Sequence, residues 1–459
     1  MLALGAGLAQ AADEFLYTVR AGDHPWNIAQ RYCKDPSYGL RLAKLNRIPN
    51  DRRMQPGTQL RIPAEWLKLQ SSRVRVLAVR GDTRLQTGAG AGRAAVEGES
   101  LLPGSSLLTG PQSSATLELE DGSRVLVRQN SELRLVQSQQ PVLHNSRLVE
   151  LELLHGGLEN TVTPASGPAS RFEIRSPSAT TAVRGTQFRV SATDKLTWTE
   201  VLEGAVLVSN AAGASTARSG SGTLTEVGLP PGAPTQLLSA PDLFSLPERM
   251  ERVPMDWPIP PVAGAVRYRT QLAPDARFEV IVSDEVSPGP RARAFDIADD
   301  NYVLRVRGID ANGLEEISAT RALVVHARPE PPLLIEPAPD SVTVSARPTF
   351  RWTQRGTRLH YRLQIASDGN DPAMAPSEQT VASTGNAEPP VDLPSGLYRW
   401  RMAAVDPATG RQGPVGRQPA VQARLARARC GCHPAGTRQH HTALVDAAAH
   451  PVVPAAART

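Results

Sequence analysis

The 459-residue chain has little of what several common fold classes require. Aromatic residues make up only 4% of it, and apolar repeats at helical spacing are scarce, which excludes a helical bundle. No apolar run approaches the roughly 18 residues of a membrane-spanning helix, so no transmembrane span is predicted. Three cysteines, at positions 33, 430 and 432, are too few and too scattered to predict a disulfide framework.

Lysine is also rare, with four examples among the 50 basic residues. The formal net charge is +5, but five arginines against a single aspartate give residues 424–459 a charge of +4 on their own. The rest of the chain is nearly neutral and carries no basic stripe interleaved with aromatics. Nucleic-acid binding is therefore not expected.

Proline and glycine are abundant, with 40 and 36 residues, while 40% of the chain is hydrophobic and 21% charged. This balance is typical of globular domains rather than of disordered chains. The length is sufficient for roughly three or four domains. Short hydrophobic runs bounded by turn residues predict strands, so the expected fold class is multidomain and mainly β.

Residues 1–11 resemble the end of a secretory signal, an apolar stretch that closes on Ala9-Gln10-Ala11. This pattern predicts export, with the bacterial periplasm as the expected location. An ordinary ragged N-terminus is the alternative.

Residues 15–67 predict a strand, two helices and a second strand. Pro25 occupies a first helical position with His24 before it as the cap, the second helix ends near Asn46, and Pro56-Gly57 turns the chain into the last strand. Trp26 is expected in the core. The result is a small β-α-α-β module.

This segment resembles a LysM domain through Tyr17-x-Val19-x-x-Gly22-Asp23-x-x-Trp26-x-Ile28-Ala29, Leu45-Asn46-x-Ile48 and Pro56-Gly57-x-x-Leu60-x-Ile62-Pro63. The resemblance implies binding of N-acetylglucosamine-containing glycans, above all peptidoglycan, in a shallow groove between two loops. The implied ligand-binding residues are Gly22, Asp23, His24, Pro25, Asn46, Arg47, Ile48 and Pro49. His24 stands where family members usually have Thr or Ser, which removes a preferred capping hydroxyl. The alternative is that Trp26 and Ile28 only build the core and the groove has no affinity.

Residues 73–210 alternate with the period of strands. The run at 115–120 is followed by the hairpin signal Asp121-Gly122 and a returning run at 124–128. Many short strands of this kind predict a sandwich, a barrel or a stacked β-roll.

The segment Val183-Arg184-Gly185-Thr186-x-Phe188 resembles the signature of a FecR-type domain. The resemblance implies an extracytoplasmic β domain, and in some family members the relay of a surface signal to a sigma factor. For Arg184 it leaves open a contact with a partner, whereas an ion pair that fixes the turn at Gly185 is the simpler interpretation.

After a predicted linker at 211–245, the sequence repeats itself with a period of about 95 residues. Tyr268-Arg269-x-Gln271 recurs as Tyr361-Arg362-x-Gln364, and the run 302–310 recurs at 398–406. The two repeats, 246–327 and 328–423, resemble fibronectin type III or immunoglobulin-like sandwiches, with Trp257 and Trp352 as expected core anchors. Such modules act as spacers or as protein-binding surfaces.

Residues 424–459 are predicted to be a disordered tail. Cys430, Cys432 and His433 fit no standard metal site, so neither a metal nor a cofactor is expected. No G-x-S-x-G or H-E-x-x-H motif occurs, and the chain is not expected to be an enzyme.

These observations together predict an exported, non-enzymatic peptidoglycan-binding protein that anchors its β modules to the cell wall as a scaffold. The alternative is a periplasmic sensor or regulator whose FecR-type domain relays a signal to a membrane partner. Peptidoglycan is the expected ligand, and a protein of the cell envelope is a second expected partner.

Overall fold

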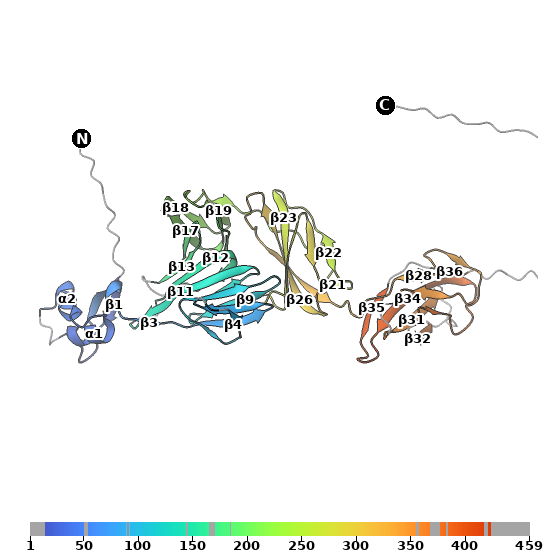
Figure 1. Cartoon of the computed structure of the whole chain (residues 1–459), viewed down its shortest axis with the longest axis horizontal. Helices are drawn as coiled ribbons and strands as arrows, with labels where there is room; N and C mark the ends of the chain where they lie inside the picture. Colours follow the sequence, from blue (N-terminus) through green and yellow to red (C-terminus); the bar gives the residue numbers. More distant parts are fainter. Residues whose placement is uncertain are drawn as a thin grey trace, which may run out of the picture.

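The chain folds into four modules that follow one another in sequence order along the long axis of the molecule (Figure 1). The structure, a computed structural model, describes residues 14–49, 54–88, 90, 92–143, 146–164, 170–183, 185–354, 358–367, 377–381, 384–416 and 421–423. The predicted signal remnant at 1–11, the tail at 424–459 and Arg184 lie outside these residues. In the described part of the chain, no helix has the length and apolar character needed to cross a bilayer.

The first module has the predicted β-α-α-β order. Its elements are β1 (Glu14–Thr18), α1 (Pro25–Tyr32), α2 (Tyr38–Leu45) and β2 (Gln59–Pro63), followed by a short 3-10 turn at Ala64–Trp66. The two strands are antiparallel and pair Leu16 with Arg61. Ile28, Leu42 and Ile62 are fully buried between the sheet and the helices, so alternate residues of each strand and one face of each helix build a common core.

The expectation that Trp26 belongs to this core is wrong. Its side chain is 40% exposed, whereas Ile28 and Ala29, further along α1, are fully buried. Because α1 packs through these two residues, Trp26 lies at the rim of the helix pair. There it contacts α2 at Gly39, where a Cβ atom would come within 3.1 Å of the indole ring.

The second module is built from 18 strands that pair into a closed barrel. They are β3 (Leu69–Ser71), β4 (Val74–Arg80), β5 (Thr83–Thr87), β6 (Arg93–Ala94), β7 (Ser100–Leu101), β8 (Ser105–Thr109), β9 (Ser114–Leu119), β10 (Arg124–Val127), β11 (Ser131–Pro141), β12 (Leu148–Thr161), β13 (Arg171–Arg175), β14 (Thr180–Val183), β15 (Gln187–Ala192), β16 (Leu196–Glu203), β17 (Ala205–Asn210), β18 (Gly213–Arg218), β19 (Ser221–Glu226) and β20 (Thr235–Gln236).

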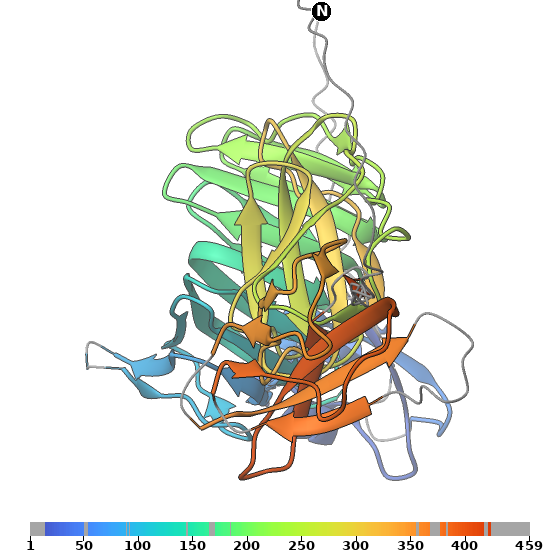
Figure 2. The same ribbon diagram turned by 90° about the vertical axis from the view of Figure 1, so that its right-hand side faces the viewer.

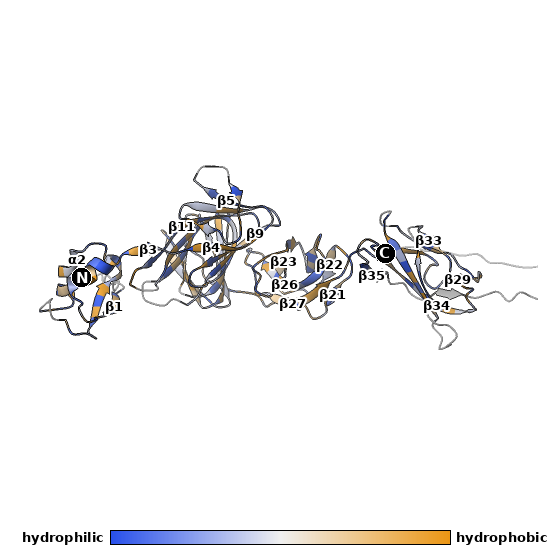
Figure 3. Cartoon of the chain, turned by 90° about the horizontal axis from the view of Figure 1, so that it is seen from below, coloured by the Kyte–Doolittle hydropathy of each residue, from blue (hydrophilic) through white to orange (hydrophobic). Residues whose placement is uncertain are grey.

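The long strand β12 joins the two halves of this barrel. Its first residues pair with β11 and, in parallel, with β13, while Gly156–Thr161 pair with β15. The hairpin predicted at Asp121-Gly122 is present, with β9 and β10 antiparallel on either side of it. Apolar and polar residues alternate along the strands (Figure 3), and the inward-facing ones form one continuous hydrophobic core.

The structure differs from the linker predicted at 211–245. Residues 213–218 and 221–226 are strands β18 and β19, which pair with β17 and β16 of the barrel. The barrel therefore extends to Gln236, well beyond the predicted boundary at 210. The abundance of small residues in this stretch indicated a flexible linker. In the structure these residues alternate along paired strands, and the pairing removes that flexibility.

The two remaining modules are mainly antiparallel β-sandwiches, each with one parallel strand pair at the edge of its larger sheet. The first contains β21 (Arg249–Met250), β22 (Met255–Pro258), β23 (Ala265–Ala273), β24 (Ser283–Ser287), β25 (Arg291–Ala294), β26 (Asp300–Asp310) and β27 (Ala319–Val325). The second contains β28 (Leu334–Glu336), β29 (Val342–Thr343), β30 (Phe350–Trp352), β31 (His360–Ser367), β32 (Ser377–Val381), β33 (Asn386–Ala387), β34 (Gly396–Val405), β35 (Gln412–Gly416) and β36 (Val421–Ala423).

The sandwiches repeat one another in register as well as in strand order. Tyr268 pairs with Gly308 across β23 and β26, and the equivalent Tyr361 pairs with Ala404 across β31 and β34. Trp352 is buried as predicted, but the equivalent Trp257 is only partly buried. The first sandwich lies directly against the barrel (Figures 1 and 2), and hydrogen bonds such as that from the Trp198 indole to the Asn312 carbonyl, 2.7 Å, join the two modules.

Candidate functional site

The loop between β1 and α1 contains four of the residues that the sequence predicts for glycan binding. Gly22 has a φ of 85°, a conformation that glycine adopts without strain, and no atom lies near the position of a Cβ. Asp23 turns inward instead of facing a ligand. Its carboxylate accepts hydrogen bonds from the Tyr17 hydroxyl at 2.6 Å and from the Arg20 amide at 2.8 Å, so it holds the loop in place.

The pKa values of this pair support a structural role. Burial raises the pKa of Asp23, but the hydrogen bonds from Tyr17 and from the Arg20 amide outweigh burial and lower it below its ordinary value. Burial and the hydrogen bond to Asp23 raise the pKa of Tyr17. The tyrosine therefore stays a neutral donor and Asp23 stays an ionised acceptor.

His24 caps helix α1 in place of the usual hydroxyl. Its Nδ1 accepts a hydrogen bond from the Asn27 amide at 3.3 Å, and the Asn27 side chain accepts one from the His24 amide at 2.9 Å. This reciprocal pair is a capping box. The departure from Ser or Thr thus removes the hydroxyl but not the cap, because a neutral imidazole nitrogen is also an acceptor. Pro25, the first residue of the helix, is buried.

The second predicted loop follows α2. The Asn46 side chain donates to the carbonyls of Leu42 and Arg61, both at 2.9 Å, and accepts from the Arg61 amide at 2.7 Å. All of its hydrogen-bonding groups therefore tie the end of α2 to β2. Arg47 adopts a φ of 52° and is exposed, as is Pro49, while Ile48 is half-buried against the core.

The eight predicted residues thus divide into two groups. Asp23, Pro25, Asn46 and Ile48 are partly or fully buried and shape the loops, whereas Gly22, His24, Arg47 and Pro49 are exposed. Among the residues described in these two loops, no hydrogen bond connects one loop to the other. The exposed group offers backbone polar groups and small apolar surfaces, the chemistry that an uncharged N-acetyl sugar requires.

The Gly185 signature of the barrel has a packing role. Gly185 has a φ of 91°, and a Cβ there would lie 2.4 Å from Cα of Pro164. Phe188 is 1% exposed and contacts Phe172 edge-on in the barrel core. Both residues therefore build the fold, and the two interpretations of Arg184 concern a residue outside the described part of the chain.

A buried cluster of charges, which the sequence did not indicate, joins the barrel to the first sandwich. Glu315 lies 2.7 Å from Arg128 of the barrel and 2.9 and 2.6 Å from Arg269 and Arg307 of its own sandwich. Glu159 of the barrel lies 2.7 Å from both Arg305 and Arg307. The ion pairs cross the boundary in both directions, so the two modules share one electrostatic core.

The carboxyl groups of this interface respond differently to burial. Burial raises the pKa of Glu315, but Arg128, Arg269 and Arg307 outweigh it and hold the pKa well below its ordinary value. At Glu200 burial wins and the pKa is raised, and burial likewise raises the pKa of Glu316 to about 7. The clustered arginines therefore lower the pKa of only some of the buried carboxyl groups.

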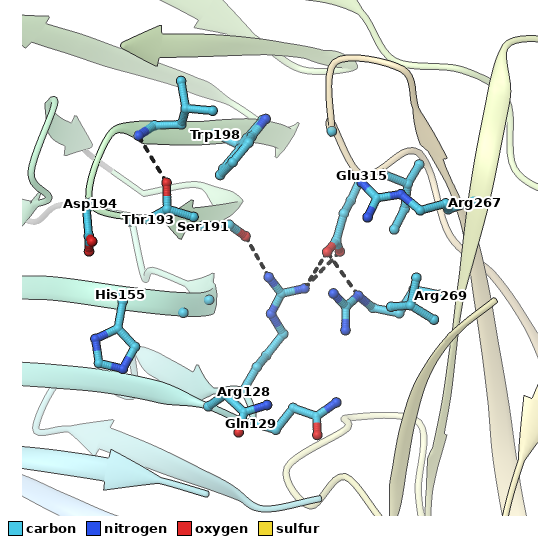
Figure 4. Close-up of a pocket in the computed structure, with 18 of the residues that line it drawn as sticks. Arg128, Gln129, His155, Ser191, Thr193, Asp194, Trp198, Arg267, Arg269 and Glu315 are labelled. Carbon is cyan, nitrogen blue, oxygen red and sulfur yellow. Dashed lines mark hydrogen bonds and ion pairs between the residues drawn. The ribbon is translucent and has the colours of Figure 1, made fainter. Parts of the chain in front are cut away.

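A pocket of about 830 Å³ lies at the edge of this cluster, between the barrel and the first sandwich (Figure 4). The barrel contributes Arg128, His155 and Trp198, and the sandwich contributes Arg267 and Arg269. Sequence reasoning missed it because its walls come from two modules that were predicted to be separated by a linker.

Comparison with known families supports the modular interpretation. The LysM domain model matches residues 17–63, and the model described as FecR protein matches residues 105–207. The chain therefore contains a LysM domain followed by a FecR-type domain, which places it among proteins of the cell envelope. A comparison with curated proteins finds no match.

The solved structures to which the chain is similar match different shares of it. A putative anti-sigma factor from Parabacteroides distasonis is 20% identical, with a TM-score of 0.22, over 26% of this chain and 53% of that one. The chain thus spans about half the length of this structure. The FN1–FN3 domains of chicken CNTN1 are 12% identical, with a TM-score of 0.19, over 59% of this chain and 95% of that one. Fibronectin(III)-like modules of Clostridium thermocellum CbhA are 16% identical, with a TM-score of 0.17, over 44% and 99%.

Proposed function

We propose that this protein is exported to the periplasm, binds peptidoglycan non-covalently through its LysM domain, and serves without catalysis as a scaffold for its β modules. The observation that supports this function best is the LysM match at residues 17–63, together with two hydrogen-bonded loops that keep exposed residues on the same small module. The glycan lies against the exposed residues Gly22, His24, Arg47 and Pro49, while Asp23 and Asn46 hold the two loops.

The test is retention of the full chain on purified sacculi. Pro49→Glu places a charge and a longer side chain on the proposed binding loop, where burying a carboxylate against an uncharged sugar is unfavourable. Retention should fall severalfold. Pro56→Glu is the matched control, because Pro56 is also exposed in the same module but lies in the turn before β2. Equal retention of the two variants, with equal thermal stability, would contradict the proposal.

A second candidate function rests on the FecR-type match at residues 105–207. In this function the barrel relays a signal to a membrane protein, which must contact its surface. Photo-crosslinking from exposed positions of β17 and β18 in cells distinguishes the two roles. Capture of an inner-membrane kinase or anti-sigma factor favours the sensor, and capture of wall or outer-membrane components alone favours the scaffold.

A further inference from the structure

The pocket between the barrel and the first sandwich has an excess of positive charge. Four of its lining side chains are basic, Arg128, Lys195, Arg267 and Arg269, and only Asp194 and Glu315 are acidic. Arg128 and Arg269 are both paired with Glu315, as Figure 4 shows. After these pairs are set aside, the pocket has two further basic side chains and one exposed aspartate.

Lys195 and Arg267 are these two remaining cations. Lys195 lies in the turn between β15 and β16 of the barrel, and Arg267 lies on β23 of the sandwich. Both side chains are exposed, and neither makes a hydrogen bond or ion pair with any residue that the structure describes. A ligand that enters the pocket thus meets one available cation from each module.

The inner part of the pocket is held rigidly. Besides its pairing with Glu315, Arg128 donates from Nη2 to the Ser191 hydroxyl at 2.6 Å. Its guanidinium crosses Gly157 so closely that a Cβ on that glycine would lie 2.0 Å from Nη2. Trp198 is fixed by its hydrogen bond to Asn312 and presents its indole to the pocket. A preorganised site of this kind loses little conformational entropy on binding.

The size and walls of the pocket restrict the ligand. A volume of about 830 Å³ is typical of sites that take an extended organic ligand and far exceeds the space of one inorganic anion. Val286, Ile309 and the Trp198 indole add apolar surface beside the cations. The ligand should therefore combine several carboxylates with aliphatic segments, and a short peptide rich in glutamate has both.

The geometry points to this pocket as a binding site for a short acidic peptide, with Lys195 and Arg267 contacting its carboxylates and Trp198 its aliphatic segments. This site is separate from the LysM loops and does not depend on glycan binding. Its ligand is either a free acidic peptide or an acidic segment of another protein, which share the same recognition chemistry.

The test uses the full chain and fluorescein-labelled N-acetyl-tetraglutamate amide, with binding followed by fluorescence anisotropy. The tetraglutamine analogue is the control probe, because it has nearly the same shape without the charges. The glutamate peptide should bind at least about tenfold more tightly, since hydrogen bonds between charged groups contribute more than neutral ones. Added salt should weaken its binding.

Two double variants locate the binding site. Lys195→Gln with Arg267→Gln should weaken binding of the glutamate peptide about tenfold, because it removes both available cations. Arg218→Gln with Arg249→Gln removes the same charge from exposed positions of the same two modules outside the pocket, and should leave the affinity unchanged. Retention on sacculi should be the same for all these proteins, which separates this test from that of glycan binding.

Three results would overturn the inference. The first is equal affinity for the glutamate and glutamine peptides. The second is an equal loss of affinity in the two double variants, which would indicate a general effect of net charge. The third is displacement of the peptide by an equal concentration of inorganic phosphate, which would reduce the pocket to an unspecific anion site. An unlabelled acidic segment embedded in a folded carrier protein, used as competitor, should displace the probe if protein segments are accepted as well as free peptides.

Discussion

The two sandwiches share a cluster of polar side chains on the same sheet. In the first, Arg269 pairs with Asp284 at 2.6 Å, and in the second the equivalent Arg362 pairs with Glu378 at 3.1 Å. Nε of Arg305 donates to Gln271 at 3.0 Å, and Nε of Arg401 donates to Gln364 at 2.6 Å. The two sequence repeats therefore form equivalent cross-strand clusters.

The difference between the two clusters lies at two positions. Arg307 of the first sandwich corresponds to Ala403 in the second, and Glu315, opposite Ile309, corresponds to Gln412, opposite Val405. Gln412 keeps the local contact, accepting from Arg362 at 2.8 Å, but it carries no charge. Only the first sandwich buries this face against the barrel, where Arg307 is 1% exposed.

This comparison indicates what the extra charge pair achieves. Burying charges costs desolvation free energy, so an ion cluster stabilises an interface only when each member keeps its partners. Glu315 has three arginines from two modules around it, and each arginine has further partners. Arg307 and Glu315 therefore specify which face of the first sandwich docks on the barrel and in which orientation. The cluster of the second sandwich lacks this pair and suits a face in contact with water.

The largest effect is expected from Glu315→Gln, which gives the first sandwich the residue of the second. Three arginines would lose the carboxylate that they share, and removal of one member of a buried ion cluster costs about 3–5 kcal/mol. Hydrogen exchange should show lost protection of amides in β26 and β16, on both sides of the interface.

The reciprocal change, Gln412→Glu, is the control for this variant. It adds the same carboxylate beside Arg362, but on a half-buried face that no barrel covers. Pairs of this kind contribute at most about 1 kcal/mol. If the two substitutions changed the unfolding free energy equally, the proposed role of Glu315 in joining the modules would be wrong.

A smaller effect is expected from Gly157→Ala, which leaves every charge in place. The added methyl would overlap the guanidinium of Arg128 and displace it from Glu315. Overpacking of this kind costs about 1–3 kcal/mol, measurable by chemical denaturation. Gly289→Ala should be neutral, because no atom lies within contact distance of its Cβ position. Equal stability of both variants would show that Arg128 can move away from Glu315 without a loss of unfolding free energy.

The sequence predicted the order of the modules because each depends on local patterns. The alternation around Asp121-Gly122 and the repeated Tyr268 and Tyr361 segments specify strands whose partners are close in the chain or duplicated. The loops of the LysM domain were also predicted, because the family signature fixes the spacing of Gly22 and Asn46.

The sequence could not predict how the modules meet. Arg305 and Arg307 alternate with apolar residues, a pattern that indicates a solvated face as readily as an interface. Their partner Glu159 is almost 150 residues away in sequence, on a different module. The inward orientation of Asp23 and Asn46 was likewise hidden, because polar loop residues bind ligands or neighbouring backbone with the same groups.

A third prediction tests the pH dependence that the interface creates. Burial raises the pKa of Glu316 from 4.5 to about 7, with the neighbouring carboxylates of Asp310 and Glu200 adding to the effect. Because the folded pKa lies above the unfolded one, the stabilising contribution is complete below about pH 4.5 and is lost as the pH rises through about 7.

Glu316→Gln should remove this loss. The variant should exceed the wild type by about 3 kcal/mol at pH 8 and match it near pH 4.5, as measured by denaturation across this range. The pKa values of Glu159 and Glu315 are lowered, so their contributions to the stability of the fold are lost as the pH falls. This loss is the same in the variant and in the wild type. The difference between the two curves therefore isolates Glu316, and parallel curves would contradict the assignment.

The smallest effect is expected from Arg401→Ala in the second sandwich. Arg401 is exposed, and its Nε donates to Gln364, whose oxygen can exchange this partner for water. The unfolding free energy should change by no more than about 0.5 kcal/mol. The same substitution at Arg305 removes one of the two arginines on Glu159 and should cost at least about 2 kcal/mol. A loss at Arg401 as large as that at Arg305 would mean that the shared cluster is itself essential to each sandwich. Arg307 and Glu315 would then not explain why the first sandwich docks on the barrel through this face while the second sandwich does not.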